Sequence, residues 1–499
     1  VDLGTSSVRT LCFGPDGSAI PESETQSVYA MDVTPDGGVF IDAERLFDLL
    51  AGCVDRALSR FAAATPLAAA VGMTSFWHSL LGLDATGRPA TPLLSWADSR
   101  SAPDAAALRA THDAAAILQR TGCRLHSSYW PAKLRWLART QPATFARVAH
   151  WVSFADYASL RLAPAAGLRT SVSLASGTGL LDVHRLDWDD ETLAMAGIDR
   201  ATLPALVDAD AGAPLGAEFG RRWPALTGAP WFPALGDGAC ANVGSGAIGS
   251  SRIALTLGTS GAMRLVLPAP AGANWRVPPD LWAYRLDRAR AVLGGALSNG
   301  GNLLAWLRQL LALAPDSADM AAAAALPPDH HGLTILPFVA GERSPAWHDA
   351  ANGIVAGLTL ATRPEHLLRA AMEAVAYRFA RIDDALRPLA AEPHQIVANG
   401  GAILNSPAWL QITADALSHP LIALPPADEA SARGAALMAS VAAGLLPDLA
   451  AAPDPAAGCP VYVPDPERTE RYRAGRLRQE RLEALFFPTA DAGHSDVDS

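Results

Sequence analysis

The sequence predicts an α/β protein built from two similar domains. Helical and strand-like apolar patterns alternate along most of the 499 residues, which is typical of helices layered on sheets. A short motif also repeats, since Asp2-Leu3-Gly4-Thr5-Ser6 recurs near mid-chain as Thr256-Leu257-Gly258-Thr259-Ser260. We therefore expect domains over residues 1–247 and 248–445, followed by a C-terminal segment over 446–499.

Individual elements can be placed in both halves. Each copy of the repeated motif reads as a strand, a Gly-Thr-Ser turn and a second strand, which makes a hairpin. The second strands of the hairpins are expected over Val8 to Phe13 and Ala262 to Leu267, further strands over Ala69 to Thr74, Ile253 to Leu257 and Ile396 to Ala398, and helices over Glu44 to Ala63, Ala105 to Arg120, Pro364 to Leu386, Ser406 to Leu417 and Pro466 to Leu485. Thr489 to Ser499 is expected to be a frayed acidic tail.

Composition excludes several classes of protein. Half of the residues are hydrophobic and 18% are charged, so the chain can bury large cores and is not globally disordered. The net charge of −11 repels phosphate backbones, so we expect no nucleic-acid partner. Lys133 is the sole lysine and lies in Trp130-Pro131-Ala132-Lys133-Leu134, so a lysine-dependent P-loop is excluded.

The cysteines and the apolar runs bear on the compartment. The five cysteines are far apart and form no CxxC pair, which argues against a disulfide framework or a zinc site and suits a cytoplasmic location. No charge-free apolar run reaches the ~18–20 residues that span a bilayer, so no membrane association is expected. The chain opens on Val1 without an initiator Met, and we expect a clipped N-terminus.

The two Gly-Thr-Ser turns are candidate phosphate sites. Glycine lets the backbone approach an anion closely, and adjacent N–H groups with hydroxyls form an anion-binding nest without lysine. The alternative is an ordinary hairpin turn. A third glycine pattern, Gly244-Ser245-Gly246-Ala247-Ile248-Gly249, fits the dinucleotide fingerprint but precedes a strand instead of opening a helix, so we reject that reading.

Two carboxylates are candidates for phosphoryl chemistry. Asp2 precedes the first turn, where it can hold Mg²⁺ directly or through water. Asp237 lies between two glycines in Leu235-Gly236-Asp237-Gly238-Ala239. It is either a helix N-cap or a general base at a loop tip, and one residue can serve both roles.

Two further segments have the composition of ligand sites. Trp77-His78 and Trp96-Ala97-Asp98-Ser99-Arg100 combine flat apolar faces with hydrogen-bonding groups, as a polyol site requires. Core aromatics with a surface Asp–Arg pair are the alternative. The glycines of Asn399-Gly400-Gly401 leave room for a flat ring, while Asn405 or Ser406 can bind that ring or cap the next helix.

These motifs together resemble the FGGY carbohydrate kinases. The order and spacing of Asp2-Leu3-Gly4-Thr5, Gly236-Asp237-Gly238, Gly258-Thr259-Ser260-Gly261 and Gly400-Gly401 match that family over residues 1–445. Segments such as Trp77-His78-Ser79 and Ser173-Leu174-Ala175-Ser176 are most similar to gluconate kinases, with xylulokinases next. The resemblance implies two actin-like (ribonuclease H-like) ATPase domains with ATP in the cleft between them, and a kinase that phosphorylates a primary hydroxyl of a sugar or sugar acid, D-gluconate first.

The resemblance also implies roles for particular residues. Asp237 would be the catalytic base and Asp2 would organise Mg²⁺ with ATP. ATP would contact Gly4, Thr5, Ser6, Arg9, Gly258, Thr259, Gly300, Gly301, Gly401 and Asn405, and the substrate would contact Trp77, His78, Trp96, Asp98, Arg100, His126 and Asp237. Arg100, His126 or Lys133 would supply the cation for a substrate carboxylate.

Three other functions stay open at this point. An actin-like filament or chaperone ATPase would need neither Asp237 nor the aromatic segments, and a degraded kinase could act as a sugar sensor. A hydride-transfer enzyme depends on the glycine pattern rejected above. The sequence fixes neither the sugar nor the oligomeric state, for which a homodimer is one option.

Overall fold

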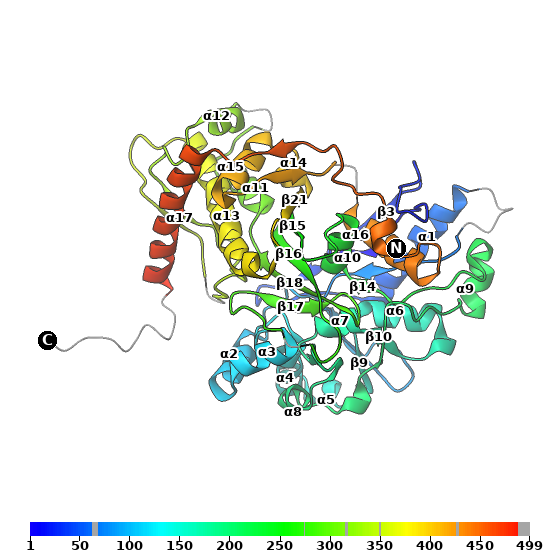
Figure 1. Cartoon of the computed structure of the whole chain (residues 1–499). Coiled ribbons are helices and arrows are strands. Elements are labelled where there is room, and N and C mark those ends of the chain that lie inside the picture. The colour runs from blue at the N-terminus through cyan, green and yellow to red at the C-terminus, as the bar shows by residue number, and fades with distance from the viewer. Residues whose placement is uncertain (62–67, 274, 315–317, 349–350, 426–428, 488–499) are drawn as a thin grey trace. The chain divides into compact units, whose positions relative to one another are not determined.

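The computed structural model describes residues 1–61, 68–273, 275–314, 318–348, 351–425 and 429–487 (Figure 1). The predicted acidic tail, Thr489 to Ser499, lies outside these residues. The chain divides into two compact units, both of α/β composition. Unit 1 comprises Val1–Gly249, Val266–Leu293 and Asp428–Asp454, and unit 2 comprises Ser250–Leu265, Gly294–Ala427 and Pro455–Ser499. Each unit draws on separated segments, whereas the domains expected from the sequence are continuous and remain a prediction.

The central sheet of unit 1 brings three strand ends together. Its strands are β1 (Asp2–Leu3), β2 (Ser7–Thr10), β3 (Thr25–Val28), β6 (Thr74–Ser75) and β14 (Leu235–Gly236), in the order β14-β6-β1-β2-β3. β1 pairs antiparallel with β2, which confirms the first hairpin. β1 and β14 both pair parallel with β6, so the carboxyl ends of β1, β6 and β14 share one edge of the sheet. Ligands of open α/β sheets bind at such an edge.

Helices and smaller sheets complete unit 1. Helix α10 (Asp237–Gly244) begins where β14 ends and packs on α16 (Ala430–Ala442). The other helices are α1 (Ala43–Ser59), α2 (Ala102–Thr111), α3 (Ala114–Thr121), α4 (Trp130–Thr140), α5 (Pro142–Phe145), α6 (Phe154–Leu162), α7 (Val172–Ser176), α8 (Asp190–Ala196) and α9 (Ala217–Arg222). The other strands are β4 (Asp32–Val33), β5 (Val39–Ile41), β7 (Leu81–Leu83), β8 (Leu93–Leu94), β9 (His150–Val152), β10 (Arg169–Ser171), β11 (Leu181–Asp182), β12 (Asp187–Trp188), β13 (Ala205–Val207), β17 (Trp282–Arg285) and the first half of β18 (Arg290–Leu297).

Four expectations for this unit were wrong in extent. The strand expected over Val8 to Phe13 ends at Thr10, and the helix expected over Glu44 to Ala63 ends at Ser59. The helix expected over Ala105 to Arg120 is two helices, because His112 is extended (φ −132°, ψ 156°) and the Asp113 side chain caps α3 by accepting from the Ala116 N–H. The strand expected over Ala69 to Thr74 is regular only at β6, since the preceding residues make just an isolated bridge between Val71 and Trp231.

Unit 2 contains the second hairpin. β15 (Arg252–Leu257) pairs antiparallel with β16 (Gly261–Pro268), as the sequence predicts, and pairs parallel with β21 (Gln395–Asn399). Strands β22 (Leu421–Ala423) and β23 (Val461–Tyr462) extend the sheet beyond β21. Leu257 and Asn399, the last residues of β15 and β21, therefore lie at the same sheet edge.

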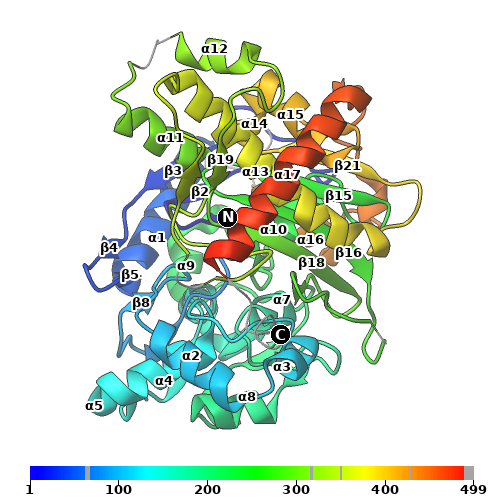
Figure 2. The ribbon, with the colours of Figure 1, turned by 90° about the vertical axis from the view of Figure 1, so that its left-hand side faces the viewer.

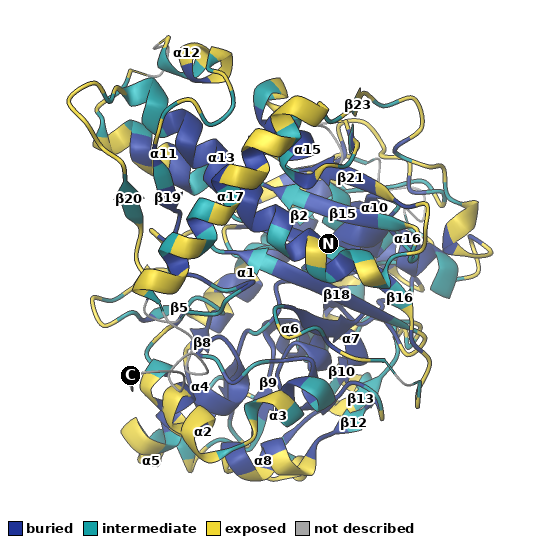
Figure 3. Ribbon diagram, turned by 60° about the vertical axis from the view of Figure 1, so that its left-hand side comes forward, coloured by how far each residue is buried: buried dark blue, intermediate teal, exposed yellow. Residues whose placement is uncertain are grey.

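The helices of unit 2 build its core around α13 (Pro364–Leu386), which is buried over most of its length and has the bounds expected from the sequence (Figure 3). The helices expected over Ser406 to Leu417 and Pro466 to Leu485 are also present, as α15 (Pro407–Leu417) and α17 (Pro466–Phe486). Helix α17 runs beside α13, and the Gln479 side chain donates to the Ala374 carbonyl (Figures 1 and 2). The remaining elements of unit 2 are the helices α11 (Gly301–Leu310), α12 (Asp319–Ala325) and α14 (Gly401–Leu404). The strands β19 (Thr334–Leu336) and β20 (Ile354–Ala356) pair antiparallel with each other.

Two expected absences can be compared with the structure. None of the described helices combines the length and the apolar content of a membrane span. All five cysteines lie in the described residues, and no disulfide joins any of them.

Candidate active site

The first Gly-Thr-Ser turn follows β1 at the shared edge of the unit 1 sheet. The Gly4 N–H donates to the Ser7 carbonyl at 3.0 Å, and the Tyr29 hydroxyl donates to the Gly4 carbonyl at 2.5 Å. These bonds fix the turn from inside the unit. Arg9 lies on the outgoing strand β2, directly across from Asp2, so a guanidinium and a carboxylate lie beside the turn.

Asp2 and Asp237 form an acidic pair at this edge. Burial, and next the charge of Asp237, raise the pKa of Asp2 to about 6. Asp237 is the first residue of α10 and its Oδ1 accepts from the Gly238 N–H at 2.7 Å. The N-cap position belongs to Gly236, so Asp237 does not cap the helix. Two nearby carboxylates that repel each other are a donor set that suits a hard divalent cation such as Mg²⁺.

The loop after β6 packs against Gly236, the residue that precedes Asp237. The Trp77 indole N–H donates to the Ser173 carbonyl at 3.0 Å, and the Ser173 hydroxyl accepts from the Gly236 N–H at 3.1 Å. A Cβ on Gly236 would lie 1.8 Å from the Trp77 ring, so only glycine fits there. Trp77 and Asp237 are therefore held in one fixed arrangement by Ser173 on α7.

His78 belongs to an aromatic cluster that the sequence revealed only in part. Its Nδ1 lies 2.5 Å from the Gly177 carbonyl, which can only accept, so Nδ1 carries the proton. Its Nε2 lies 3.5 Å from the Tyr284 hydroxyl, which in turn lies 2.7 Å from the Tyr129 hydroxyl. Tyr284 comes from β17, far along the chain. Sequence reasoning missed both tyrosines because neither stands in a motif with a local signal.

The Trp96–Arg100 segment is mostly engaged within the protein. Asp98 is buried and takes both Nε and Nη2 of Arg100, and its Oδ2 also accepts from the Val39 N–H. The Arg100 guanidinium lies 4.3 Å from the centre of the Trp136 ring. The pair is therefore not on the surface, as the alternative had it, but its polar groups are paired within the protein. A substrate role for Trp96, Asp98 and Arg100 stays a prediction.

Lys133 and His126 lie beside this segment. Lys133 is completely buried, and its Nζ donates to the Ser127 carbonyl at 2.5 Å and the Asp98 carbonyl at 3.4 Å. Burial lowers the pKa of Lys133 to about 7. The His126 Nδ1 accepts from the Ser128 N–H at 3.1 Å. Lys133 thus joins two loops and is a poor candidate for binding a substrate carboxylate.

In unit 2 the expected nucleotide residues gather around the second turn. The Gly301 N–H donates to the Gly258 carbonyl at 2.8 Å, and the Asn302 N–H donates to the Thr259 carbonyl at 3.1 Å. Gly400 has φ +98°, and a Cβ there would lie 2.6 Å from the Leu257 carbonyl. Three separated segments therefore meet at one turn: Gly258 and Thr259, Gly300 and Gly301, and Gly400 and Gly401, with Asn405 at the end of α14. Ser406 caps α15, as one alternative had it.

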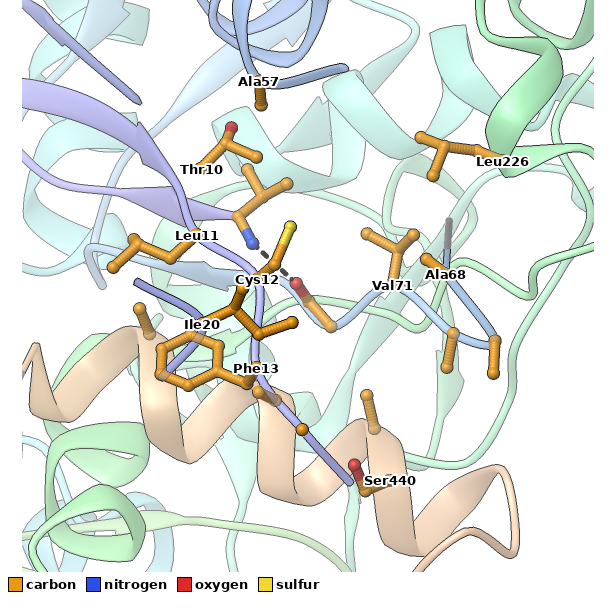
Figure 4. A pocket seen from close by; sticks show the side chains of 18 of the residues that line it. Thr10, Leu11, Cys12, Phe13, Ile20, Ala57, Ala68, Val71, Leu226 and Ser440 are labelled. Atoms are coloured by element: carbon orange, nitrogen blue, oxygen red, sulfur yellow. Dashed lines mark hydrogen bonds between the residues drawn. The ribbon is translucent and has the colours of Figure 1, made fainter. Parts of the chain in front are cut away.

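Two other features carry none of the predicted site residues. A cavity of about 280 Å³ in unit 1 has mainly apolar walls, formed by Thr10 to Phe13, Ala68 to Gly72 and one face of α16 (Figure 4). Among the described residues, Asp329, His331 and Glu373 also have metal-ligand spacing. Glu373 already accepts from Arg369 at 2.6 Å and from His331 at 3.0 Å, so this group is a hydrogen-bond network.

Comparison with known proteins covers almost the whole chain. The N-terminal domain of the FGGY family of carbohydrate kinases matches residues 1–244, and the C-terminal domain of that family matches residues 253–443. A gluconokinase of Bacillus licheniformis is 27% identical over 492 residues, which cover 95% of this chain and 93% of the relative. A glycerol kinase of Rhodospirillum centenum is 31% identical over 461 residues and is covered to 90%, as is this chain.

Solved structures agree with this fold. A gluconate kinase from Lactobacillus acidophilus superposes with a TM-score of 0.88 at 25% identity, covering 99% of this chain and 98% of the other. A xylulose kinase from the same organism superposes with a TM-score of 0.89 at 25% identity, covering 99% of both chains.

Proposed function

Because the chain belongs to the FGGY family of carbohydrate kinases, with its two-domain actin-like fold, we propose that it transfers the γ-phosphoryl group of ATP to the primary hydroxyl of a sugar acid. D-gluconate is the first candidate, and 6-phosphogluconate is the product. Similarity to a gluconokinase and to a gluconate kinase structure supports this choice. Xylulose or another pentulose or polyol is the alternative, in line with the xylulose kinase and glycerol kinase relatives.

One observation carries the proposal: the acidic pair Asp2 and Asp237 lies at the sheet edge where the loop carrying Trp77 and His78 begins. In this proposal Asp237 accepts the proton of the attacking hydroxyl, and its place at the start of α10 holds it still while phosphorus is attacked. Phosphoryl transfer passes through a loose transition state, so positioning and charge stabilisation supply most of the rate.

The nucleotide would be held by backbone and hydroxyl groups. We assign its contacts to Gly4, Thr5, Ser6, Arg9, Gly258, Thr259, Gly300, Gly301, Gly401 and Asn405. Asp2, next to Asp237, would hold Mg²⁺, which supplies charge neutralisation at the phosphates. The cluster of unit 2 residues around the second turn and the two carboxylates of unit 1 support these assignments.

The substrate would lie against Trp77, His78, Trp96, Asp98, Arg100, His126 and Asp237. A gluconate carboxylate then has Arg100 as its candidate cation, because Lys133 donates to backbone carbonyls and the His126 Nδ1 accepts from the Ser128 N–H. His126 can still offer its Nε2 N–H to the substrate. The His78 Nδ1 donates to the Gly177 carbonyl, so Nε2 is the ring nitrogen left to contact a substrate hydroxyl.

The test is ADP release coupled to an indicator reaction, screened across gluconate, xylulose, ribulose, glycerol and fuculose. We expect gluconate to give the highest kcat/KM. A higher value for xylulose or glycerol would transfer the assignment to that substrate. ATP hydrolysis indifferent to every sugar would instead favour a filament or chaperone ATPase of the same fold.

The setting of the reaction is also a proposal. We place the enzyme in the cytoplasm, consistent with five cysteines that form no disulfide. A homodimer is the oligomeric state to test by light scattering.

A further inference from the structure

Glu429, which no sequence motif singled out, forms an ion pair with Arg9. The residue occupies the N-cap position of α16, and its Oε2 contacts Nη1 of Arg9 on β2. Both side chains are about one-third exposed or less. The pair joins segments more than four hundred residues apart in sequence and lies within unit 1, beside the first Gly-Thr-Ser turn.

The ion pair with Glu429 uses only one edge of the Arg9 guanidinium, the edge that carries Nη1. Arginines elsewhere in unit 1 present Nε and Nη2 together to a carboxylate, as Arg100, Arg139 and Arg222 do. Glu429 uses Nη1 instead, and the buried Nε of Arg9 has no hydrogen-bond partner in the part of the chain that the structure describes. A buried unpaired N–H is costly, because it has lost its hydrogen bond to water without gaining another. A phosphate oxygen is an acceptor that fits a guanidinium edge.

The packing of α16 on α10 fixes where Glu429 lies. A Cβ on Gly244 would lie 1.8 Å from the Ala430 carbonyl, so the two helices touch backbone to backbone. The Arg433 Nη1 donates to the Gly244 carbonyl at 2.6 Å, and the Ser431 hydroxyl donates to the Asp237 carbonyl at 3.4 Å. The start of α16 is thereby tied to the helix that carries Asp237.

We propose that Glu429 is a positioning residue for phosphate recognition: it holds Arg9 through Nη1, so that the Nε edge faces a phosphate of the bound nucleotide. Arg9 touches the ligand, and Glu429 acts through Arg9. This inference rests on the proposed function for the identity of the ligand as an adenine nucleotide. A carboxylate near phosphates also repels them, so charge alone predicts that its removal tightens binding, whereas positioning predicts the reverse.

The test is calorimetric titration of the full chain with ADP, without sugar. Glu429→Ala should weaken ADP binding by about three- to tenfold, which is the scale of one partly exposed ion pair that orders a side chain. Glu429→Gln should retain part of the affinity, because its amide oxygen still accepts from Nη1. Glu44→Gln is the matched control. Glu44 lies in the first turn of α1 and forms an ion pair with Arg161, and the variant should bind ADP as tightly as the parent does.

A double-mutant cycle separates positioning from a general effect. In an Arg9→Ala background, Glu429→Ala should change ADP affinity less than about twofold. The same loss in both backgrounds, or tighter ADP binding in Glu429→Ala, would overturn the proposal. In turnover assays the KM for ATP should rise while the KM for the sugar stays constant.

Failure of this inference can be told from failure of the proposed function. If the parent chain phosphorylates no sugar, but Glu429→Ala still weakens ADP binding as described, the proposed function is refuted and the role of Glu429 stands. If the parent chain phosphorylates gluconate, but Glu429→Ala binds ADP as tightly as the parent does, only the role of Glu429 is refuted.

Discussion

Asp237 shows how one side chain can be tested apart from the fold around it. Asn in its place keeps an Oδ1 that accepts from the Gly238 N–H, so Asp237→Asn should leave the melting temperature nearly unchanged. Loss of a general base should lower kcat by about 10²–10⁴-fold. Steady-state kinetics with the best sugar of the screen measure this effect.

The control for that variant is Asp113→Asn, which changes the N-cap of α3 and should not alter kcat. Near-full turnover by Asp237→Asn would remove the proposed base from the mechanism.

Burial of Lys133 should make the stability of the protein depend on pH. Its pKa falls from the usual 10.5 to about 7 on folding, because the ammonium is buried. The unfolded chain therefore binds more protons than the folded chain between pH 7 and 10.5, so stability should rise with pH across that window. The destabilisation that the buried ammonium causes has its full value below about pH 7. The gain from pH 7 to pH 9 should be about 2 kcal/mol.

Lys133→Met removes the titrating group, so urea unfolding should show that this part of the slope is lost. The level of stability is a poorer readout, since the carbonyls of Ser127 and Asp98 lose their donor. An identical slope in parent and variant would mean that Lys133 keeps its usual pKa.

At the scale of elements, the contact between α10 and α16 is the most demanding packing around the acidic pair. A Cβ on Gly434 would lie 1.9 Å from the Cys240 carbonyl of α10, so Gly434→Ala must push the helices apart. We expect a loss of about 2 kcal/mol or more in stability, and a roughly tenfold fall in kcat as Asp237 shifts.

Gly220→Ala is the matched control, because it lies in helix α9 with no atom within 4 Å of the added Cβ. Alanine should stabilise that helix by about 0.5–1 kcal/mol. Thermal melts and kcat measurements compare the two variants. Equal melting temperatures and equal kcat values would contradict the close packing of α10 on α16.

At the scale of the whole molecule, the sequence predicted what local signals encode. Both hairpins, the bounds of α13 and the glycine turn before α14 were predictable because spacing and turn residues specify them. The break at His112 was missed, since Asp113 caps a new helix inside a continuous apolar pattern. Glu429, Tyr284 and the burial of Lys133 depend on contacts between distant segments, which one sequence does not reveal.

The C-terminal helix, for which the sequence suggested no role, belongs to the core of unit 2. Glu483 on α17 accepts from Arg378 of α13 at 2.5 Å and from Arg381 at 2.9 Å, while Arg378 also donates to Glu342 at 2.6 Å. Arg378 and Glu483 are buried. Burial alone would raise the pKa of Glu483, but the His348 ring and the charges of Arg378 and Arg381 hold it at about 2.

Glu483→Gln should therefore destabilise unit 2 strongly, because it leaves the buried Arg378 with a single carboxylate. Breaking a buried ion pair costs about 3–5 kcal/mol, and we expect the lower end, since glutamine keeps a hydrogen bond. A cost of 3 kcal/mol lowers the melting temperature by roughly 6–12 °C in a unit of this size. Because the folded pKa is depressed, the stabilisation is complete above about pH 4.5 and is lost as the pH falls through about 2.

Calorimetric melts at pH 7 measure the effect of Glu483→Gln. Glu470→Gln is the control, because Glu470 lies on the same helix in an exposed pair with Arg473 and should shift stability by less than about 0.5 kcal/mol. Equal melting of the two variants would mean that α17 contributes through its apolar contacts alone, and that the buried network is not what joins it to α13.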